Sequence, residues 1–181
     1  FYLIQGRMFS SAEAGLLLTA QPVIMAIIAP LSGTLSDRLG TRWLTMSGMA
    51  VLTVGLLLLS QLGPESSVRS IVFSLGVMGL GTGTFISPNN SALMGAAPRQ
   101  RQGIAAGILA TARNFGMVLG VGISGSIFTT LIAQGEGSTM VGEASGAVFY
   151  KAIQICFLVA AGIAFMGVLT SVSRGKVIDS R

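Results

Sequence analysis

The chain has no histidine and a single cysteine, Cys156. A His/Cys metal site and a disulfide within the chain are therefore excluded. Cys156 lies in the apolar run Ile155-Cys-Phe-Leu-Val, where we expect it to pack as a small apolar side chain. The sequence therefore predicts neither a metal nor a cofactor.

The chain also has few charged residues. Only 9% of the 181 residues are charged, against about 25% in soluble domains, and 51% are hydrophobic. Such a chain cannot cover a surface that faces water, so we expect its surroundings to be a lipid bilayer. The net charge of +5 does not indicate nucleic acid, because the basic residues stand at the ends of apolar runs without interleaved aromatics.

Five apolar runs are long enough to cross a bilayer, which takes about 20 residues. Their residues are 12–34, 43–62, 71–94, 103–133 and 147–172. The runs do not alternate polar and apolar residues as barrel strands do, so each is predicted to be a helix. The fourth run exceeds one span, which implies a tilt, a kink or an extension beyond the membrane. The fold class predicted is an all-α membrane protein with about five transmembrane helices.

Basic residues are unevenly divided between alternate breaks in these runs. One set holds Arg38, Arg42, Arg99, Arg101, Arg174, Lys176 and Arg181, and the other holds Arg7, Arg69 and Lys151. The positive-inside rule places the first set, and with it the C-terminus, in the cytoplasm. The first residue then lies outside and is not Met, which we expect of a chain whose upstream part is missing.

Three of the few charged side chains gather in the stretch Gly33-Thr-Leu-Ser-Asp-Arg-Leu-Gly-Thr-Arg. Two explanations are open for it. The stretch is a positive-inside loop, or it is a tight turn in which Asp37 accepts hydrogen bonds from a helix N-terminus or pairs with an arginine.

The spacing of this stretch resembles the cytoplasmic loop of the major facilitator superfamily, which joins the second and third helices of each six-helix half. Further resemblance lies in Gly79–Met94, Pro98–Gly107 and Ala112–Gly120, which look like the fourth and fifth helices of such a half. They are most similar to drug/proton antiporters with fourteen helices. Val77–Gly83 lacks the Arg, and Gly116–Gly125 the Pro, that are typical of the N-terminal half. The resemblance therefore implies that residues 1–181 form most of a C-terminal six-helix half-bundle.

The resemblance implies a secondary transporter of the plasma or bacterial inner membrane, and not an enzyme. It would export drug-like or amphipathic small molecules by alternating access, coupled to protons. Its partner would be the missing N-terminal half, which must supply the proton-carrying group because no Asp or Glu lies well inside a span here. A cytoplasmic gating motif would hold that side closed, formed by Gly33, Asp37, Arg38, Gly40 and Arg42. The alternative is a non-transporting multi-pass assembly or scaffold protein.

Polar side chains inside a span are functional candidates, because hydrocarbon makes them costly. The candidates are Gln21, Asn89, Asn90, Arg113 and Asn114. Gln21 bonds either a substrate or a neighbouring helix, and Pro22 beside it kinks the first run. Asn89 and Asn90 either line the cavity or, as we favour, satisfy carbonyls freed by Pro88. Arg113 either faces the bundle interior or extends toward the cytoplasm. In the interior its acceptors would be those same groups or a carboxylate from the missing half.

Glycines at four-residue spacing mark a further feature of the fourth run. Gly103 pairs with Gly107 and Gly116 with Gly120. Such spacing lets helix backbones approach closely in lipid. We predict helix packing at these glycines, with sliding along the same seam as a compatible role.

Overall fold

The computed structural model describes residues 2–136 and 146–173. The described residues form helices joined by short connections, and no strand is among them. Two short helices come first, η1 (Tyr2–Gly6) and α1 (Ser11–Leu18). The long helices are α2 (Ala20–Leu39), α3 (Thr41–Ser60), α4 (Val68–Ala96), α5 (Gln102–Glu136) and α6 (Gly146–Ser173), and the short η2 (Arg99–Arg101) lies between α4 and α5.

The prediction of five membrane-crossing helices is confirmed. The segments long and apolar enough to cross a membrane are Ser11–Leu39, Thr41–Ser60, Val68–Ala96, Arg99–Leu131 and Gly146–Ser171. Each predicted run lies within a few residues of one of them. In hydrocarbon the helix is the spanning structure that satisfies every backbone group within its own segment, so length and apolarity alone locate these elements.

The first predicted run is divided in two, because α1 ends at Leu18 and α2 begins at Ala20. Pro22 has no N–H to donate to the carbonyl of Leu18, four residues earlier, so the helical ladder is interrupted there. Thr19 lies between the two helices, and its hydroxyl donates to the carbonyl of Leu16 at 2.5 Å. The interruption therefore stands one turn before Pro22. Pro30, by contrast, lies inside a continuous α2.

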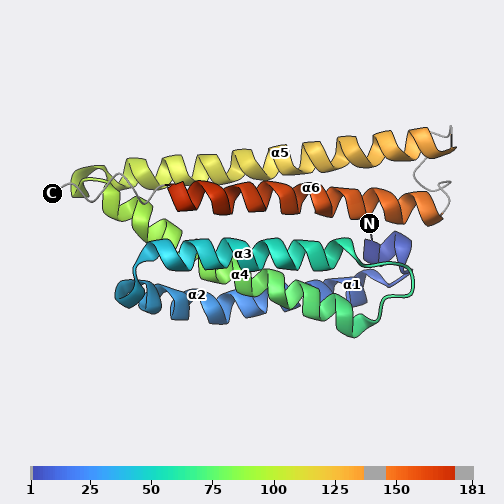
Figure 1. The fold of residues 1–181 in the computed structure, drawn as a ribbon, viewed down its shortest axis with the longest axis horizontal. Helices are drawn as coiled ribbons and strands as arrows, with labels where there is room; N and C mark the ends of the chain where they lie inside the picture. Colours follow the sequence, from blue (N-terminus) through green and yellow to red (C-terminus); the bar gives the residue numbers. More distant parts are fainter. Residues whose placement is uncertain (1, 137–145, 174–181) are drawn as a thin grey trace.

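The helices lie nearly parallel in two groups, as Figure 1 shows, with α1 to α4 on one side and α5 and α6 on the other. Helix α4 packs against both α2 and α3, and α3 packs against α6. Helix α5 packs mainly against α6, with a small contact to α4 near their connection. It is therefore the least enclosed of the long helices.

Aromatic side chains and hydrogen bonds hold together the end of the molecule where α3 ends and α6 begins. The Tyr2 hydroxyl donates to the carbonyl of Gly63 at 2.9 Å, and the Tyr150 hydroxyl donates to that of Gly6 at 2.5 Å. The rings of Phe128 on α5 and Phe149 on α6 meet edge to face, with centroids 5.6 Å apart. These contacts tie η1, α3, α5 and α6 at this end.

Candidate functional site

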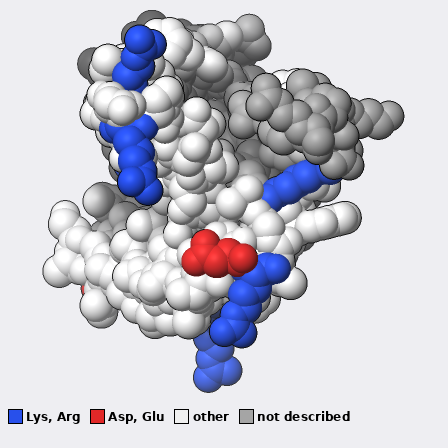
Figure 2. All heavy atoms as spheres, turned by 90° about the vertical axis from the view of Figure 1, so that its left-hand side faces the viewer, with Lys and Arg blue, Asp and Glu red and all other residues white. Residues whose placement is uncertain are grey.

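Charged side chains mark the opposite end of the bundle, where α2 and α4 end and α3 and α5 begin. We call this the basic end. Its described charged residues are Asp37, Arg38, Arg42, Arg99 and Arg101, and all five side chains are exposed. Figure 2 looks onto this end and shows basic groups at separate places on it, with an acidic group between them. Four positive charges thus stand against one negative charge.

The predicted gating motif is mostly helical, and only Gly40 of its residues lies outside α2 and α3. Gly33, Asp37 and Arg38 belong to the last turns of α2, which continues to Leu39, beyond residue 34 where the first apolar run was predicted to end. A single residue, Gly40, separates α2 from α3. Its φ of 86° is a conformation that side-chain-bearing residues rarely adopt, and its N–H donates to the carbonyl of Ser36 at 2.9 Å. Gly40 therefore turns the chain back without a loop.

The charged members of the motif stand on both sides of this turn. Asp37 and Arg38 lie on the last turn of α2, and Arg42 lies on the first turn of α3. Within the described ranges, the Asp37 carboxylate accepts no hydrogen bond and forms no ion pair, whereas Arg42 does have a partner. The role of these charges in gating stays a prediction.

Sequence reasoning missed Ser32, a buried serine that joins α2 to α4. Ser32 and Ser36 are both buried, although the exposed charges of the motif follow directly, and the Ser36 hydroxyl donates to the carbonyl of Gly33 within α2 at 2.7 Å. The Ser32 hydroxyl lies 3.2 Å from the carbonyl of Gly83 and 3.3 Å from that of Thr84, both on α4. Gly33 is close to α4 as well, since a methyl group on it would lie 2.8 Å from Oγ of Ser87. The signal in the sequence was the run of small residues at Ser32 and Gly33, because small residues let a neighbouring helix approach closely.

The bond from Ser32 corrects the role favoured for the asparagines. Pro88 is fully buried inside α4, and the carbonyl that it frees is that of Thr84, four residues earlier. Ser32, and not Asn89 or Asn90, approaches this carbonyl. Both asparagines are half-buried, and no hydrogen bond of their side-chain amides is formed within the described part of the chain. The other possibility, that they line a cavity, stays a prediction.

Gln21 lies at an apolar cavity of about 320 Å³. Its neighbours there include Leu18, Met78 and Phe157, which come from α1, α4 and α6. The backbone of Gln21 also meets α4 closely, because a methyl group on Gly79 would lie 2.5 Å from the Gln21 carbonyl oxygen. Its side-chain amide forms no hydrogen bond with the residues that the structure describes. A role in binding a substrate or a helix remains open.

Arg113 and Asn114 lie on the exposed part of α5. Neither side chain is hydrogen-bonded to any described residue, so the acceptors expected for Arg113 on α4 are not its partners here. The glycines predicted to pack are also exposed. A methyl group placed on Gly103, Gly107, Gly116 or Gly120 would meet nothing within 4 Å. Their packing role and the path role of Arg113 therefore stay predictions.

The close helix crossings use other glycines, which lie on α3 and α4. A methyl group on Gly48 would lie 2.6 Å from the backbone nitrogen of Phe85, and one on Gly55 would lie 2.8 Å from that of Met78. Gly81 and Gly83 on α4 are also buried. Gly81 lies close to α3, and Gly83 lies close to α2. The stretch Gly79–Gly83 is thus the crossing point of three helices.

Comparison with known proteins agrees with this architecture. The model of the Major Facilitator Superfamily matches residues 2–176. The riboflavin transporter RibZ of Clostridioides difficile is 31% identical over 172 residues, which are 95% of this chain and 37% of that protein.

Two drug-resistance proteins are also similar. The multidrug resistance protein Stp of Mycobacterium tuberculosis is 30% identical over 132 residues, 73% of this chain and 24% of that protein. The quinolone resistance protein NorB of Staphylococcus aureus is 30% identical over 129 residues, 70% of this chain and 28% of that protein. The chain thus spans little more than a third, at most, of the length of these three relatives.

Membrane-crossing helices, the turn at Gly40 and a family match along nearly the whole sequence lead to one assignment. The chain is a multi-pass protein of the cell membrane, related to transporters. It belongs to the major facilitator superfamily.

Proposed function

We propose that residues 1–181 form most of the C-terminal half of a proton-coupled exporter of drug-like or amphipathic small molecules. The half-bundle would rock against an N-terminal half about a central substrate site, which gives alternating access. Two relatives are named for resistance to drugs and a third for riboflavin, and these names support an organic small molecule as the substrate.

The observation that carries the proposal is the arrangement at the α2–α3 turn. An exposed carboxylate, Asp37, stands among arginines at one end of a bundle that otherwise has little charge. Ser36, directly before it, is buried, and Ser32 donates to carbonyls of α4, so the last turns of α2 are fixed against α4. Such a group can form and break charged hydrogen bonds with the partner half as the two halves rock.

Proton coupling would depend on a group outside this chain. The described helices carry no Asp or Glu deep within a span, because Glu13 and Asp37 stand near helix ends. Transport by the whole protein should nevertheless respond to an imposed pH gradient in proteoliposomes. Export that is unaffected when a protonophore collapses this gradient would contradict proton coupling and leave the transporter assignment intact.

Replacement of Asp37 tests the gating role. A charge-assisted hydrogen bond contributes about 1.5–3 kcal/mol, so Asp37→Asn should lower efflux by about tenfold or more at matched expression. Glu65→Gln is the matched control, because Glu65 is an exposed acid in the α3–α4 connection at the other end. Equal efflux from Asp37→Asn and the control would contradict the gating role and favour a scaffold protein.

A further inference from the structure

A single side chain joins α2 to the point at which a proline interrupts α4. Pro88 lies inside α4 and has no N–H to donate to the carbonyl of Thr84, four residues earlier. The Ser32 hydroxyl of α2 lies 3.3 Å from this carbonyl and 3.2 Å from that of Gly83. A hydrogen bond from a different helix therefore replaces the one that Pro88 removes from α4.

Burial makes this hydrogen bond hard to replace. Ser32 is 4% exposed and Pro88 is less than 2% exposed, so water has little access to the contact between the two helices. In a membrane-crossing helix, a carbonyl without a donor is costly, and side chains of neighbouring helices can satisfy it. The position of α2 therefore bears directly on the α4 ladder at the place where that ladder is incomplete.

The part of α4 that precedes Pro88 is held by neighbours on two sides. A methyl group on Gly48 of α3 would lie 2.6 Å from the backbone nitrogen of Phe85. A methyl group on Gly83 would lie 3.1 Å from the carbonyl oxygen of Met25 on α2. Such backbone approaches leave this part of α4 little freedom to tilt. Pro88, three residues after Phe85, is therefore the place where α4 can bend.

We propose that Ser32 is a positioning residue, which couples the bend of α4 at Pro88 to the position of α2. While the hydroxyl reaches the freed carbonyl, the angle between the two parts of α4 is fixed. When α2 shifts and this bond is lost, the angle changes. Only the purpose of the coupling rests on the proposed function: α2 also carries Asp37, so a movement of the gating charges would be passed on to α4.

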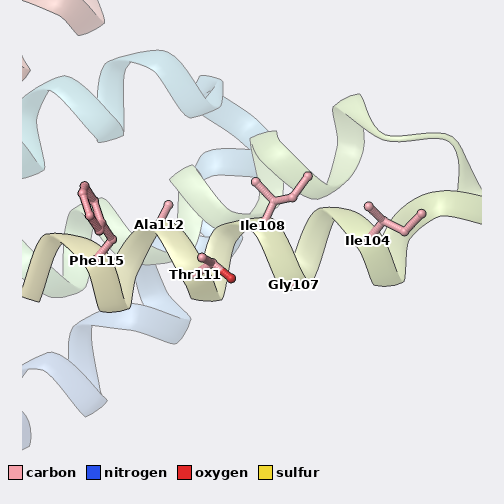
Figure 3. A pocket seen from close by; sticks show the side chains of 6 residues that line it. All are labelled: Ile104, Gly107, Ile108, Thr111, Ala112 and Phe115. Carbon is pink, nitrogen blue, oxygen red and sulfur yellow. The ribbon is translucent and has the colours of Figure 1, made fainter.

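The bend would also move the start of α5. Helix α4 ends at Ala96 and continues through η2 into α5. Figure 3 shows the first part of α5, where Ile104, Ile108 and Phe115 project to one side and line a groove of about 570 Å³. A change of angle at Pro88 would displace this side of α5 together with the end of α4.

Distances between spin labels test the coupling in the full-length transporter in lipid nanodiscs. One label is placed on α3 at Val54→Cys and the other at an end of α4, at Ala96→Cys or Val68→Cys, in a background without Cys156 or other cysteines. All three label positions are exposed. Ser32→Ala should shift the Ala96–Val54 distance by about 4 Å, the displacement that a bend of about 20° gives the end of eight helical residues. The Val68–Val54 distance should not change, which also shows that the rest of the fold is intact.

Ser36→Ala is the matched control. Ser36 is a buried serine of the same helix, but its hydroxyl donates within α2, to the carbonyl of Gly33. Both distances should stay unchanged in this variant. An unchanged Ala96–Val54 distance in Ser32→Ala, or an equal shift in Ser36→Ala, would overturn the proposal.

Pro88→Ala distinguishes the coupling from a general loss of packing. Alanine restores an N–H for the carbonyl of Thr84, so α4 no longer depends on the hydroxyl of Ser32. In the Pro88→Ala background, Ser32→Ala should therefore shift the Ala96–Val54 distance no further. The same shift with and without the proline would overturn the coupling. Because the labels are measured without a substrate or an ion gradient, that result would leave the proposed transport function standing.

Discussion

Gly40 shows how much one residue decides in this fold. Among the described glycines, Gly40 alone has a positive φ. It caps both the end of α2 and the start of α3. Any side chain there is strained, whatever the surrounding space. Because Gly40 forms the turn between the two helices, it places Asp37 and Arg38 on one side of that turn and Arg42 on the other.

Gly40→Ala should therefore lower the free energy of unfolding in detergent by about 1–3 kcal/mol. Gly63→Ala is the matched control, because Gly63 also lies in a connection and has nothing within 4 Å, but its φ is not positive. We expect the control to change stability by less than about 0.5 kcal/mol. Equal stability of the two variants would show that the turn at Gly40 has a different conformation.

Arg113 is the residue whose placement is most costly in lipid. It lies about 18 Å along the helix from Arg101, on an exposed part of α5. An arginine near the centre of a span costs about 2.5–3.5 kcal/mol on insertion scales. A fold keeps such a group where a function requires it.

Arg113→Leu should insert more readily than the unaltered protein and yet lose transport. Arg113→Lys should also lose transport, because an ammonium cannot replace the planar fork of a guanidinium. Efflux by both variants, measured in the full-length protein at equal membrane expression, decides the point. An active Arg113→Lys would mean that the arginine only anchors α5 at the membrane surface.

At the scale of elements, the α3–α4 crossing is the most closely packed contact. A methyl group on Gly81 would lie 2.7 Å from Cα of Leu52 and 2.9 Å from the carbonyl oxygen of Gly48. Because these are backbone atoms, no side-chain rotation relieves the overlap. The two helices would have to separate.

Gly81→Ala should destabilise the protein by about 1–3 kcal/mol through this overpacking. Gly162→Ala on α6 is the control, since that glycine is exposed and meets nothing within 4 Å. Removal of a helical glycine should leave the control unchanged or stabilise it by up to about 1 kcal/mol. Unfolding in detergent measures both, and an unaffected Gly81→Ala would contradict the close crossing.

At the scale of the whole molecule, charge asymmetry predicts the orientation in the membrane. The basic end carries four described arginines, and the positive-inside rule assigns it to the cytoplasm. The other end would then face outward.

Labelling of single cysteines in intact cells checks this orientation. In a Cys156→Ala background, Glu65→Cys should react with an impermeant thiol reagent added outside, and Gln100→Cys should not. Both positions are exposed, so the reagent reports the side of the membrane and not burial. Labelling of Gln100→Cys from outside, without cell lysis, would reverse the assignment.

The sequence by itself determined the membrane helices and the division of charge between their ends. In lipid, the length and apolarity of a run specify a helix, because a spanning segment has to satisfy its own backbone groups. The five predicted runs therefore lie where the structure has helices. The resemblance at Gly33–Arg42 and in α4 and α5 identified the family for the same reason, since it depends on local spacing.

Only the tertiary structure decided which polar and small residues meet. Gly103 and Gly107 have the same spacing as glycines that pack, yet the close crossings use Gly48, Gly55 and Gly81. Ser32, not the asparagines beside Pro88, bonds the carbonyl that Pro88 frees. Lipid tails are as apolar as the side chains packed between helices, so hydrophobicity does not reveal which face of a helix is buried. That choice depends on backbone approach and on hydrogen bonds between helices far apart in the sequence.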